Sequence, residues 1–555
     1  MLVCAFFLRS SYISDVARRL VAAAIDLNDI PYADGARFAG TSHCLPGTRE
    51  EILDRIQALL AGTADEEIPR IVLLTGVAGY GKSAVASTIA ERFEERQRLG
   101  SSFFFNRNVD NQNHVGNLFT TIARDIADAN PEIKEKLWST IKDSRTLRKT
   151  TNVREQFVRF ILDPAKQLTT IGPIIIVIDG FDECGDPTSR ERLINVFAKE
   201  LSDLPSNFRI LLTARPEEDV IRGLASLPSV QHIRMESIDK KLITADLTSF
   251  VAKELSGIGD ELEREWPQME WQDELVKKAG DLFIWTSTAC RFIINKGHGG
   301  TDYSKRLKLV LSESPESRML APLDDLYRTV LRSAFEEQDI DATARFKTVV
   351  GKILAVKVPL SGNALSDFLE AEASASDKNA RSVIKSVVSY LGSVLIGSIE
   401  LNTPLQILHL SFSDFLTAPS RSGAFFIDIK EQTQLMAMLC LDIMNKHLKR
   451  NICDIDDFVA PNPKVEDVRK LMAKFEILQY VCRHWVDHVV NLDTCEKSLL
   501  DRIWTFVSGN ALHWIETLSL TDQLECGVGS LDRLGIWLQV RINLIGCLRN
   551  SSFLI

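Results

Sequence analysis

Short apolar runs alternate with amphipathic segments from about residue 70 to residue 236. The segments between the runs, near residues 83–95, 113–128, 153–167 and 189–202, have the spacing of helices with one buried face. The apolar runs predict strands at Ile71–Leu74, Ser102–Phe105, Ile174–Ile178, Phe208–Thr213 and His232–Met235. Strands that alternate with helices predict an α/β domain with a parallel sheet. Because the strands are continuously apolar, helices are expected on both faces of the sheet.

Helical periodicity replaces this pattern after residue 240. Leu247, Val251 and Leu255 share one helix face, and a second helix-rich block runs from Leu323 to about Thr417. That block ends in two short β-like runs, Ser393–Ile399 and Leu405–Leu410, which together with the helices predict a winged-helix unit. The remainder reads as further helices, with no repeat of 20–50 residues.

These patterns predict five regions along the chain. A short N-terminal segment, 1–43, carries a helix near Ile13–Ala24, and Thr48 followed by Glu51 predicts a capping box at the first helix of the next region. The other regions are an α/β domain at 44–238, a helical domain at 239–320, a winged-helix-like domain at 321–420 and a C-terminal helical region without repeats at 421–555.

Composition and charge narrow the class of protein. The 555 residues are 45% hydrophobic and 25% charged, which is ordinary for a soluble globular chain. A net charge of −10 gives no reason to expect a nucleic-acid partner, and no apolar run reaches the roughly 20 residues of a membrane-spanning helix. The apolar start Met1–Leu8 reads as a helix start, not as a signal peptide. The ten cysteines form no C-x-x-C pair, so a cytoplasmic protein without a zinc site or disulfide framework is expected.

A phosphate-binding loop follows the first predicted strand. The motif G-x-x-x-x-G-K-[ST] is matched by Gly76, Val77, Ala78, Gly79, Tyr80, Gly81, Lys82 and Ser83, and Ala84 continues into a predicted helix. A strand, a glycine loop and a helix start together direct free N–H groups and the positive helix end at one point. Lys82 is expected to contact the β- and γ-phosphates, and Ser83 is expected to hold Mg²⁺. The alternative, a glycine-rich turn that binds nothing, does not account for the flanking strand and helix.

Acidic residues follow the third predicted strand. Asp179 ends this apolar strand, in the manner of the Walker B carboxylate that holds Mg²⁺ in P-loop proteins. Asp182 and Glu183 come just beyond it, where a carboxylate can orient and deprotonate an attacking water. As an alternative, Asp179 caps a helix after a core strand.

An arginine follows the fourth predicted strand. Arg215 comes directly after Phe208–Thr213 and is expected at the same sheet edge, where a planar guanidinium can sense a γ-phosphate. Taken alone, an arginine in this position is usually a surface residue. Its order after the two phosphate motifs favours the nucleotide site.

Five segments in this order resemble the NACHT group of STAND NTPases, in the NOD-like receptor form that is common in filamentous fungi. Besides the P-loop, the segments are Cys44–Arg49 at the start of the domain, Asp179–Cys184, Leu212–Glu217 and His409–Leu416. The resemblance covers about residues 44–515 and implies a signalling switch. In such a switch ADP holds a closed state, and exchange for ATP with Mg²⁺ permits self-association and signalling to an effector protein in innate-immunity or cell-death pathways.

His409 is the residue that the resemblance assigns to the ADP phosphate from the winged helix. A histidine can donate to a phosphate oxygen and gains charge in that field. The alternative is a core histidine, because Leu408 and Leu410 flank it in a predicted strand.

The chain departs from the family pattern at both ends, and rival functions stay open. Only about 40 residues precede the NTPase domain and no repeats follow residue 516, so the sequence is expected to be a short form, a truncated product or a mispredicted gene product. The alternatives are a P-loop scaffold that binds nucleotide without turnover, a GTP-preferring NTPase, and a metabolic phosphotransferase such as a nucleoside kinase. The long helical extension disfavours the kinase.

Overall fold

The computed structural model describes residues 27–551, except 39–42, 63–67, 108, 110–111, 113, 167, 169–171, 263–268, 296–301, 313–320, 336, 373–378, 398–399, 454–474, 495 and 522. The predicted helix near Ile13–Ala24 lies outside the described residues. The chain divides into two compact units, Met1–Ser287 and Thr288–Ile555. None of the helices in the described part of the chain is long and apolar enough to span a membrane.

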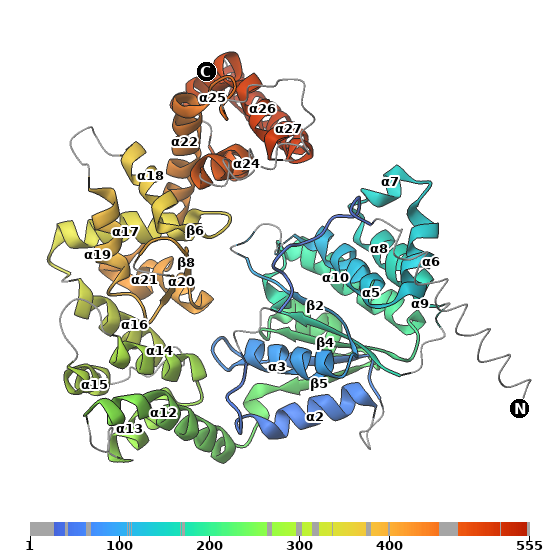
Figure 1. Ribbon diagram of the computed structural model, residues 1–555, viewed down its shortest axis with the longest axis vertical. Coiled ribbons are helices and arrows are strands. Elements are labelled where there is room, and N and C mark those ends of the chain that lie inside the picture. Colours follow the sequence, from blue (N-terminus) through green and yellow to red (C-terminus); the bar gives the residue numbers. More distant parts are fainter. Residues whose placement is uncertain are drawn as a thin grey trace, which may run out of the picture. The chain divides into compact units, whose positions relative to one another are not determined.

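A five-stranded parallel sheet organises the first unit (Figure 1). Its strands are β1 Ile71–Thr75, β2 Leu99–Phe104, β3 Ile174–Asp179, β4 Phe208–Ala214 and β5 Val230–Arg234, in the spatial order β2-β3-β4-β1-β5. The predicted parallel α/β fold is confirmed. Because Thr75 pairs with Ala214, and Phe104 pairs with Asp179, the carboxyl ends of β1, β2, β3 and β4 meet at one edge of the sheet.

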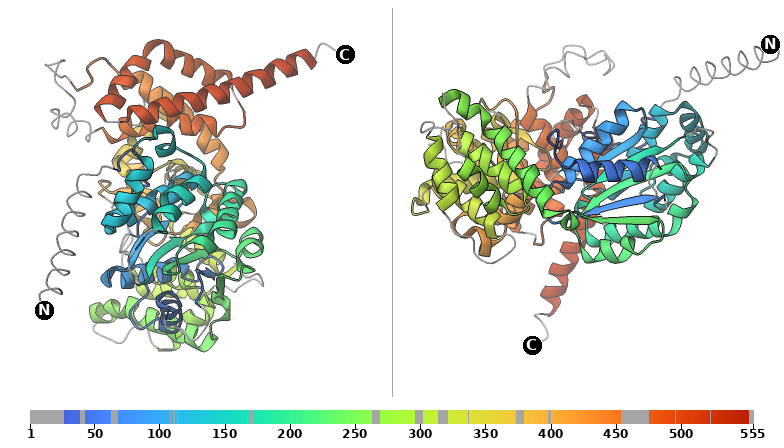
Figure 2. Two further views of the ribbon diagram at one scale, coloured as in Figure 1. Left: turned by 90° about the vertical axis from the view of Figure 1, so that its right-hand side faces the viewer. Right: turned by 90° about the horizontal axis from the view of Figure 1, so that it is seen from below.

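Helices flank this sheet (Figures 1 and 2). Among the described residues before 238, the helices of eight or more residues are α2 Glu50–Ala61, α3 Lys82–Glu95, α5 Leu118–Ala129, α6 Pro131–Ile141 and α10 Pro187–Glu200. Shorter pieces are η1 Val115–Asn117, α7 Arg145–Arg148, η3 Phe181–Glu183, η4 Leu201–Asp203, α11 Glu218–Val220, η5 Ile221–Ala225 and η6 Met235–Ser237. The helix predicted near 153–167 consists of α8 Val153–Gln156, a π-helical turn η2 Phe157–Leu162 and α9 Asp163–Ala165.

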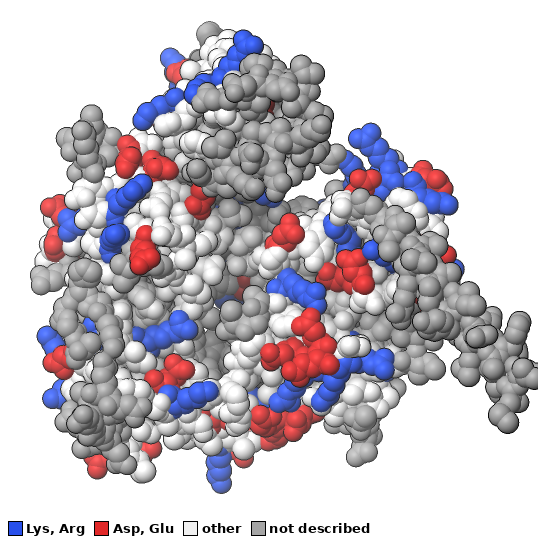
Figure 3. All heavy atoms as spheres, in the orientation of Figure 1, with Lys and Arg blue, Asp and Glu red and all other residues white. Residues whose placement is uncertain are grey.

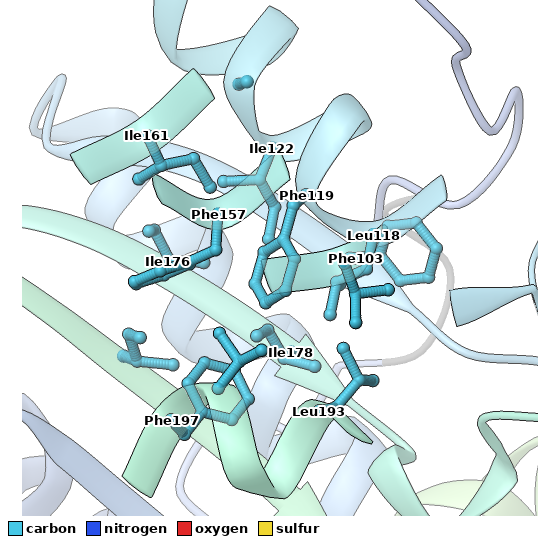
Figure 4. Close-up of a cluster of buried hydrophobic side chains, with 14 of the residues drawn as sticks. Phe103, Leu118, Phe119, Ile122, Phe157, Ile161, Ile176, Ile178, Leu193 and Phe197 are labelled. Atoms are coloured by element: carbon cyan, nitrogen blue, oxygen red, sulfur yellow. The ribbon is translucent and has the colours of Figure 1, made fainter. Parts of the chain in front are cut away.

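An aromatic cluster fills one side of the sheet (Figure 4). The Phe119 ring lies 5.0 Å from that of Phe157 and 5.9 Å from that of Phe197, centroid to centroid. Phe181, in the turn η3 after β3, joins the same cluster at 6.2 Å from Phe197 and is fully buried. The core therefore anchors the turn that carries Asp182 and Glu183.

Residues 27–38 form a strap over β2 and α5. Ile30, Ala33 and Ala36 are buried in the core of the first unit. The amide of Phe104, the last residue of β2, donates to the carbonyl of Ala36 at 2.7 Å, and the amide of Ala33 donates to Thr121 Oγ1 at 3.0 Å. This strap, which the sequence pattern placed in a separate N-terminal segment, packs as part of the α/β domain.

A carboxylate that accepts hydrogen bonds from two hydroxyl groups helps to hold the strap in place. Asp125 of α5 accepts hydrogen bonds from Tyr32 (2.8 Å) and Ser101 (2.6 Å). Asp125→Ala leaves both hydroxyls without this acceptor, at a cost of about 1–3 kcal/mol. We expect the thermal unfolding midpoint of the intact chain to fall by about 2–12 °C, since 1 kcal/mol shifts a domain of this size by roughly 2–4 °C.

Asp128→Ala is the matched control for this prediction. Asp128 lies on the same helix, and its side chain is 69% exposed. It forms a surface ion pair with Lys134. An exposed pair contributes about 0–1 kcal/mol. Equal shifts for the two variants would contradict a role for Asp125 in holding the strap.

The predicted capping box at Thr48 is wrong. The residue that caps α2 is Arg49, in a left-handed conformation (φ 59°), so Thr48 stands one position too early. The Thr48 hydroxyl donates to the carbonyl of Leu45 at 2.7 Å, and Glu50, not Glu51, accepts from the backbone, from the Gly47 amide at 3.3 Å. The turn at 45–48 is thereby closed within itself, and the Arg49 side chain is directed into the protein, where it is buried.

Helices dominate after residue 238, as predicted. They are α12 Lys240–Leu262, α13 Met269–Ala279, α14 Phe283–Ile294, α15 Tyr303–Ser312, α16 Ala321–Ala334, α17 Ile340–Ala355, α18 Gly362–Glu372, α19 Ala380–Val388, α20 Leu410–Leu416, α21 Pro419–Ser422, η7 Gly423–Phe425, α22 Ile429–His447, α24 Glu476–Val490, α25 Lys497–Gly509, α26 Ala511–Leu520 and α27 Leu524–Ser551. A three-stranded antiparallel sheet accompanies them, with β6 Leu360–Ser361, β7 Leu395–Ile396 and β8 Pro404–Ile407 in the order β6-β8-β7. The two predicted β-like runs are β7 and β8, both shorter than expected, and β6 is an additional strand.

Candidate nucleotide site

The P-loop joins β1 to α3 at the carboxyl edge of the sheet. Gly79 and Gly81 adopt left-handed conformations, with φ of 90° and 92°, which favour glycine over any residue with a side chain. Gly81 is the N-cap of α3, so the loop runs directly into the helix N-terminus. The local geometry is that of a phosphate cradle.

Lys82 folds over this loop. Its Nζ donates to the carbonyls of Gly76 at 2.6 Å and Val77 at 3.1 Å. Burial lowers the pKa of Lys82, and the negative charges of Asp182 and Asp179 oppose that shift. The ammonium group therefore lies at the loop, within the field of Asp179 at the end of β3 and of Asp182 in η3.

Asp179 and Ser83, the predicted Mg²⁺ ligands, are brought together. Asp179 ends β3 and is buried. Its carboxylate accepts hydrogen bonds from the hydroxyls of Ser83 and of Thr213, the latter at 2.5 Å. Burial raises the pKa of Asp179, while these two hydroxyls and the Lys82 charge lower it. Thr213 was not singled out from the sequence, although it stands at the end of the strand that precedes Arg215.

Asp182 and Arg215 form a pair. The Arg215 amide donates to Asp182 Oδ1 at 2.8 Å, and the Arg215 Nε lies 3.3 Å from Oδ2. Arg190 of α10 holds the backbone of the same turn by donating to the Asp182 carbonyl at 3.0 Å. The buried Asp182 carboxylate thus fixes where the arginine stands on the sheet edge.

Glu183 lies beside this pair in a different electrostatic setting. Burial, reinforced by the negative charge of Asp182, raises the pKa of Glu183 to about 8, and Arg107 opposes the shift. The amide of Arg107, in the loop after β2, lies 3.4 Å from Glu183 Oε2. A carboxyl group whose pKa lies near the working pH is suited to proton transfer.

A second set of contacts, not anticipated from the sequence, holds the P-loop from outside. Arg49 Nη2 donates to the Tyr80 carbonyl at 3.0 Å, and its guanidinium lies 4.5 Å from the centroid of the Phe283 ring. The amide of Ile284, in α14, donates to the Gly79 carbonyl at 3.1 Å. Arg49 was visible only as the last residue of the segment Cys44–Arg49, because its partners are distant in sequence.

Acidic residues from η6, from α12 and from the turn between α13 and α14 complete these contacts. Glu236 of η6 accepts from the Val77 amide at 2.9 Å, and Asp281 accepts from the Tyr80 hydroxyl at 3.3 Å. Asp246 of α12 accepts from the Arg49 amide at 3.1 Å. Burial together with the charges of Asp281 and Glu236 raises the pKa of Tyr80 to about 12, so this hydroxyl stays a donor.

His409 belongs to the second unit, and the prediction that it lies in a strand is wrong. It is the N-cap of α20, and its Nδ1 accepts from the Ser411 amide at 3.1 Å. The same Nδ1 lies 2.7 Å from Ser411 Oγ, which in turn lies 2.7 Å from the buried hydroxyl of Tyr327. The alternation Leu-His-Leu mimics a strand, but the backbone turns into a helix at Leu410. The assignment of His409 to the ADP phosphate stays a prediction.

Residues 47–215 match the family model described as "Nephrocystin 3, N-terminal". This segment is similar to that family, and the chain resembles the NACHT-type STAND NTPases. The match begins at the turn before α2 and ends at Arg215, so it includes the P-loop, Asp179, Asp182 and Glu183. No curated protein sequence matches the chain.

The solved structures that align with the chain have low sequence identity to it and low TM-scores. A STAND protein with a tetratricopeptide repeat sensor from Pyrococcus horikoshii aligns with a TM-score of 0.36 and 11% identity, covering 95% of this chain and 67% of that one. C. elegans PCH-2 aligns at 0.26 and 15% identity over 47% of this chain and 66% of that one. The Orc1 protein of Aeropyrum pernix, solved with DNA, aligns at 0.27 and 15% identity over 68% of this chain and 94% of that one.

Proposed function

We propose that the chain is a nucleotide-controlled switch that binds ATP or ADP with Mg²⁺, hydrolyses ATP slowly and self-associates in the triphosphate state. The observation that carries this proposal is the convergence of four kinds of group at one sheet edge. They are the glycine loop with Lys82, the Ser83–Asp179 pair, the Asp182–Arg215 pair and the carboxyl group of Glu183.

In this proposal, the P-loop side of the carboxyl edge of the sheet binds the phosphates and the metal ion. The backbone N–H groups of residues 79–84 and the Lys82 ammonium would hold the phosphates. A serine hydroxyl and a buried carboxylate in hydrogen-bonding contact are the oxygen ligands that Mg²⁺ prefers, so the residues present fit this ion. When bound there, Mg²⁺ would supply positive charge to the transferring phosphoryl group.

The two acidic residues beyond β3 have different proposed roles. Asp182 is engaged by Arg215 through both the backbone and the guanidinium, which favours a positioning role for Asp182 and a phosphate-sensing role for the arginine. Glu183, with its raised pKa, is the proposed general base for the attacking water. The signalling context, the adenine preference, the effector protein and the contact of His409 with ADP are supported by the family resemblance alone.

Size-exclusion chromatography with light scattering tests the switch. We expect the intact chain to stay small with ADP and Mg²⁺ and to form larger species with a non-hydrolysable ATP analogue, because only the triphosphate is proposed to permit assembly. A GTP analogue run in parallel tests base preference. The same elution with both adenine nucleotides would overturn the switch, and in that case bound ATP without phosphate release would establish the scaffold instead.

A further inference from the structure

A cleft opens on the first unit between α10 and the wall formed by η1 and α8. Its volume is about 710 Å³, within the range of ligand sites on proteins. Ser189, Arg192, Val196 and Lys199 line it from one face of α10. His114–Gly116 and Thr151–Arg154 line it from the opposite wall.

Among the described residues that line this cleft, the charged side chains are those of Arg192, Lys199 and Arg154. Arg154 is paired with Glu200, so Arg192 and Lys199 supply the positive charge that remains. The face drawn in Figure 3 carries both signs, and the chain as a whole carries a net charge of −10. The cleft is therefore a local cationic site on an acidic protein, and it favours a negatively charged occupant.

The arrangement of the cations suits an extended occupant. Arg192 and Lys199 are seven residues apart on one helix, which separates their Cα atoms by about 10.5 Å along its axis. Arg154 stands on the opposite wall, where its Nε donates to Glu200 at 2.7 Å and ties the two walls together. Because Arg154 is already paired with Glu200, a chain of carboxylates would meet Arg192 and Lys199 in succession, whereas a single small anion can meet only one of them.

The cleft is joined to the candidate catalytic turn. Gly185, two residues after Glu183, has Ser189 and Val115 of the cleft lining beside it. A Cβ on Gly185 would lie 3.1 Å from the Ser189 Cβ and 3.7 Å from the Val115 Cγ1. The two walls also continue into the residues that surround Glu183, since α10 follows its turn and η1 follows the loop of Arg107. An occupant of the cleft would therefore contact α10 and η1, the two elements that are joined to the segments around the Glu183 carboxyl group.

We propose that this cleft binds an acidic peptide segment of a protein, and that its occupation changes the rate of hydrolysis at Glu183. The second half of the proposal rests on the proposed NTPase function, and the first half does not.

Binding is tested with a fluorescein-labelled decaglutamate peptide added to the intact chain, followed by fluorescence anisotropy. We expect saturable binding that weakens with salt, because the contacts join exposed charges. The double variant Arg192→Glu/Lys199→Glu should bind at least about tenfold more weakly, a loss of about 1.4 kcal/mol. Both side chains are exposed, so this variant should fold normally, as checked by circular dichroism.

The matched control is Lys240→Glu/Lys241→Glu at the start of α12. It changes the net charge equally, but neither residue lines the cleft. Equal weakening by both double variants would show non-specific attraction and overturn the site. Binding of a neutral Gly-Ser decapeptide with the same affinity would also overturn it, as would equal displacement of the peptide by an equal concentration of inorganic phosphate.

The coupling is tested by measuring ATP turnover with and without saturating decaglutamate. We expect turnover to change in the unmodified chain and in the Lys240→Glu/Lys241→Glu control, but not in the Arg192→Glu/Lys199→Glu variant. Peptide binding with unchanged turnover would overturn the coupling. A chain that binds the peptide in the cleft but never hydrolyses ATP would refute the proposed function and leave the binding site standing.

Discussion

The variant Lys82→Ala is expected to lose at least 100-fold in affinity for ATP and less for ADP. Lys82 lies at the loop that would hold the phosphates, and its ammonium is proposed to contact both the β- and the γ-phosphate. A charge-assisted hydrogen bond contributes about 1.5–3 kcal/mol, which corresponds to about 10- to 150-fold in affinity. Because ADP lacks the γ-phosphate, it should lose one contact where ATP loses two.

Isothermal titration calorimetry with each nucleotide and Mg²⁺ measures both losses. Lys240→Ala is the control, because it removes a lysine from an exposed helix start of the same unit. Circular dichroism is needed as well, since Lys82 also donates to the Gly76 and Val77 carbonyls, and its removal takes two hydrogen bonds from the loop. ATP affinity equal to that of the unmodified chain would remove the P-loop assignment.

The sheet and the P-loop could be predicted because their signals are local. Strands β1 and β3 are continuous apolar runs up to their last residue, and the glycines that need left-handed conformations stand at fixed spacing within eight residues. The same holds for Asp179, which directly ends such a run. Chain order along a parallel sheet then places these groups at one edge.

The partners within the site could not be predicted, because they depend on distant residues. Nothing in the sequence pairs Asp182 with Arg215, or brings Arg49 to the Tyr80 carbonyl and the Phe283 ring. The strap at residues 27–38 was missed for a related reason. Its buried residues, Ile30, Ala33 and Ala36, are spaced as neither helix nor strand, and backbone hydrogen bonds hold it in place.

His409 shows how a short pattern misleads. One polar residue between leucines fits a strand, yet the imidazole caps a helix by accepting from the Ser411 amide. The loss of an N-cap alone costs about 0.5–2 kcal/mol. A substitution meant to probe ADP binding must therefore keep a capping side chain, which makes Asn preferable to Leu at this position.

The largest expected effect on turnover is that of Glu183→Gln, which should lower the rate of ATP hydrolysis by about 10²- to 10⁴-fold and leave ATP affinity nearly unchanged. Glutamine keeps the shape of the side chain and its place beside Arg107, but it cannot accept a proton from water. Single-turnover phosphate release measures the rate of hydrolysis, and calorimetry measures the affinity for ATP.

Asp182→Asn is the informative comparison, because it should disturb the position of Arg215 and so weaken ATP binding as well as hydrolysis. The opposite pattern, with turnover retained in the Gln variant and lost in Asp182→Asn, would move the base to Asp182.

The pH dependence of hydrolysis gives this prediction a second readout. A general base acts only when deprotonated, so turnover by the unmodified chain should rise as the pH passes through about 8, the raised pKa of Glu183. The Glu183→Gln variant should lack this rise in turnover.

The stability of the folded protein should change with pH in the opposite direction, falling as the pH rises. Because the pKa of Glu183 in the folded protein lies above its usual value of 4.5, the folded state holds this proton more tightly than the unfolded state does. The contribution of Glu183 to stability is therefore complete below about pH 4.5 and is lost as the pH rises through about 8. Glu183→Gln has no such proton to lose, so its thermal midpoint, compared with that of the unmodified chain, should shift upward between pH 6 and pH 9. A parallel pH course of the two midpoints would mean that Glu183 is not held in the buried, acid-flanked setting that makes it a candidate base.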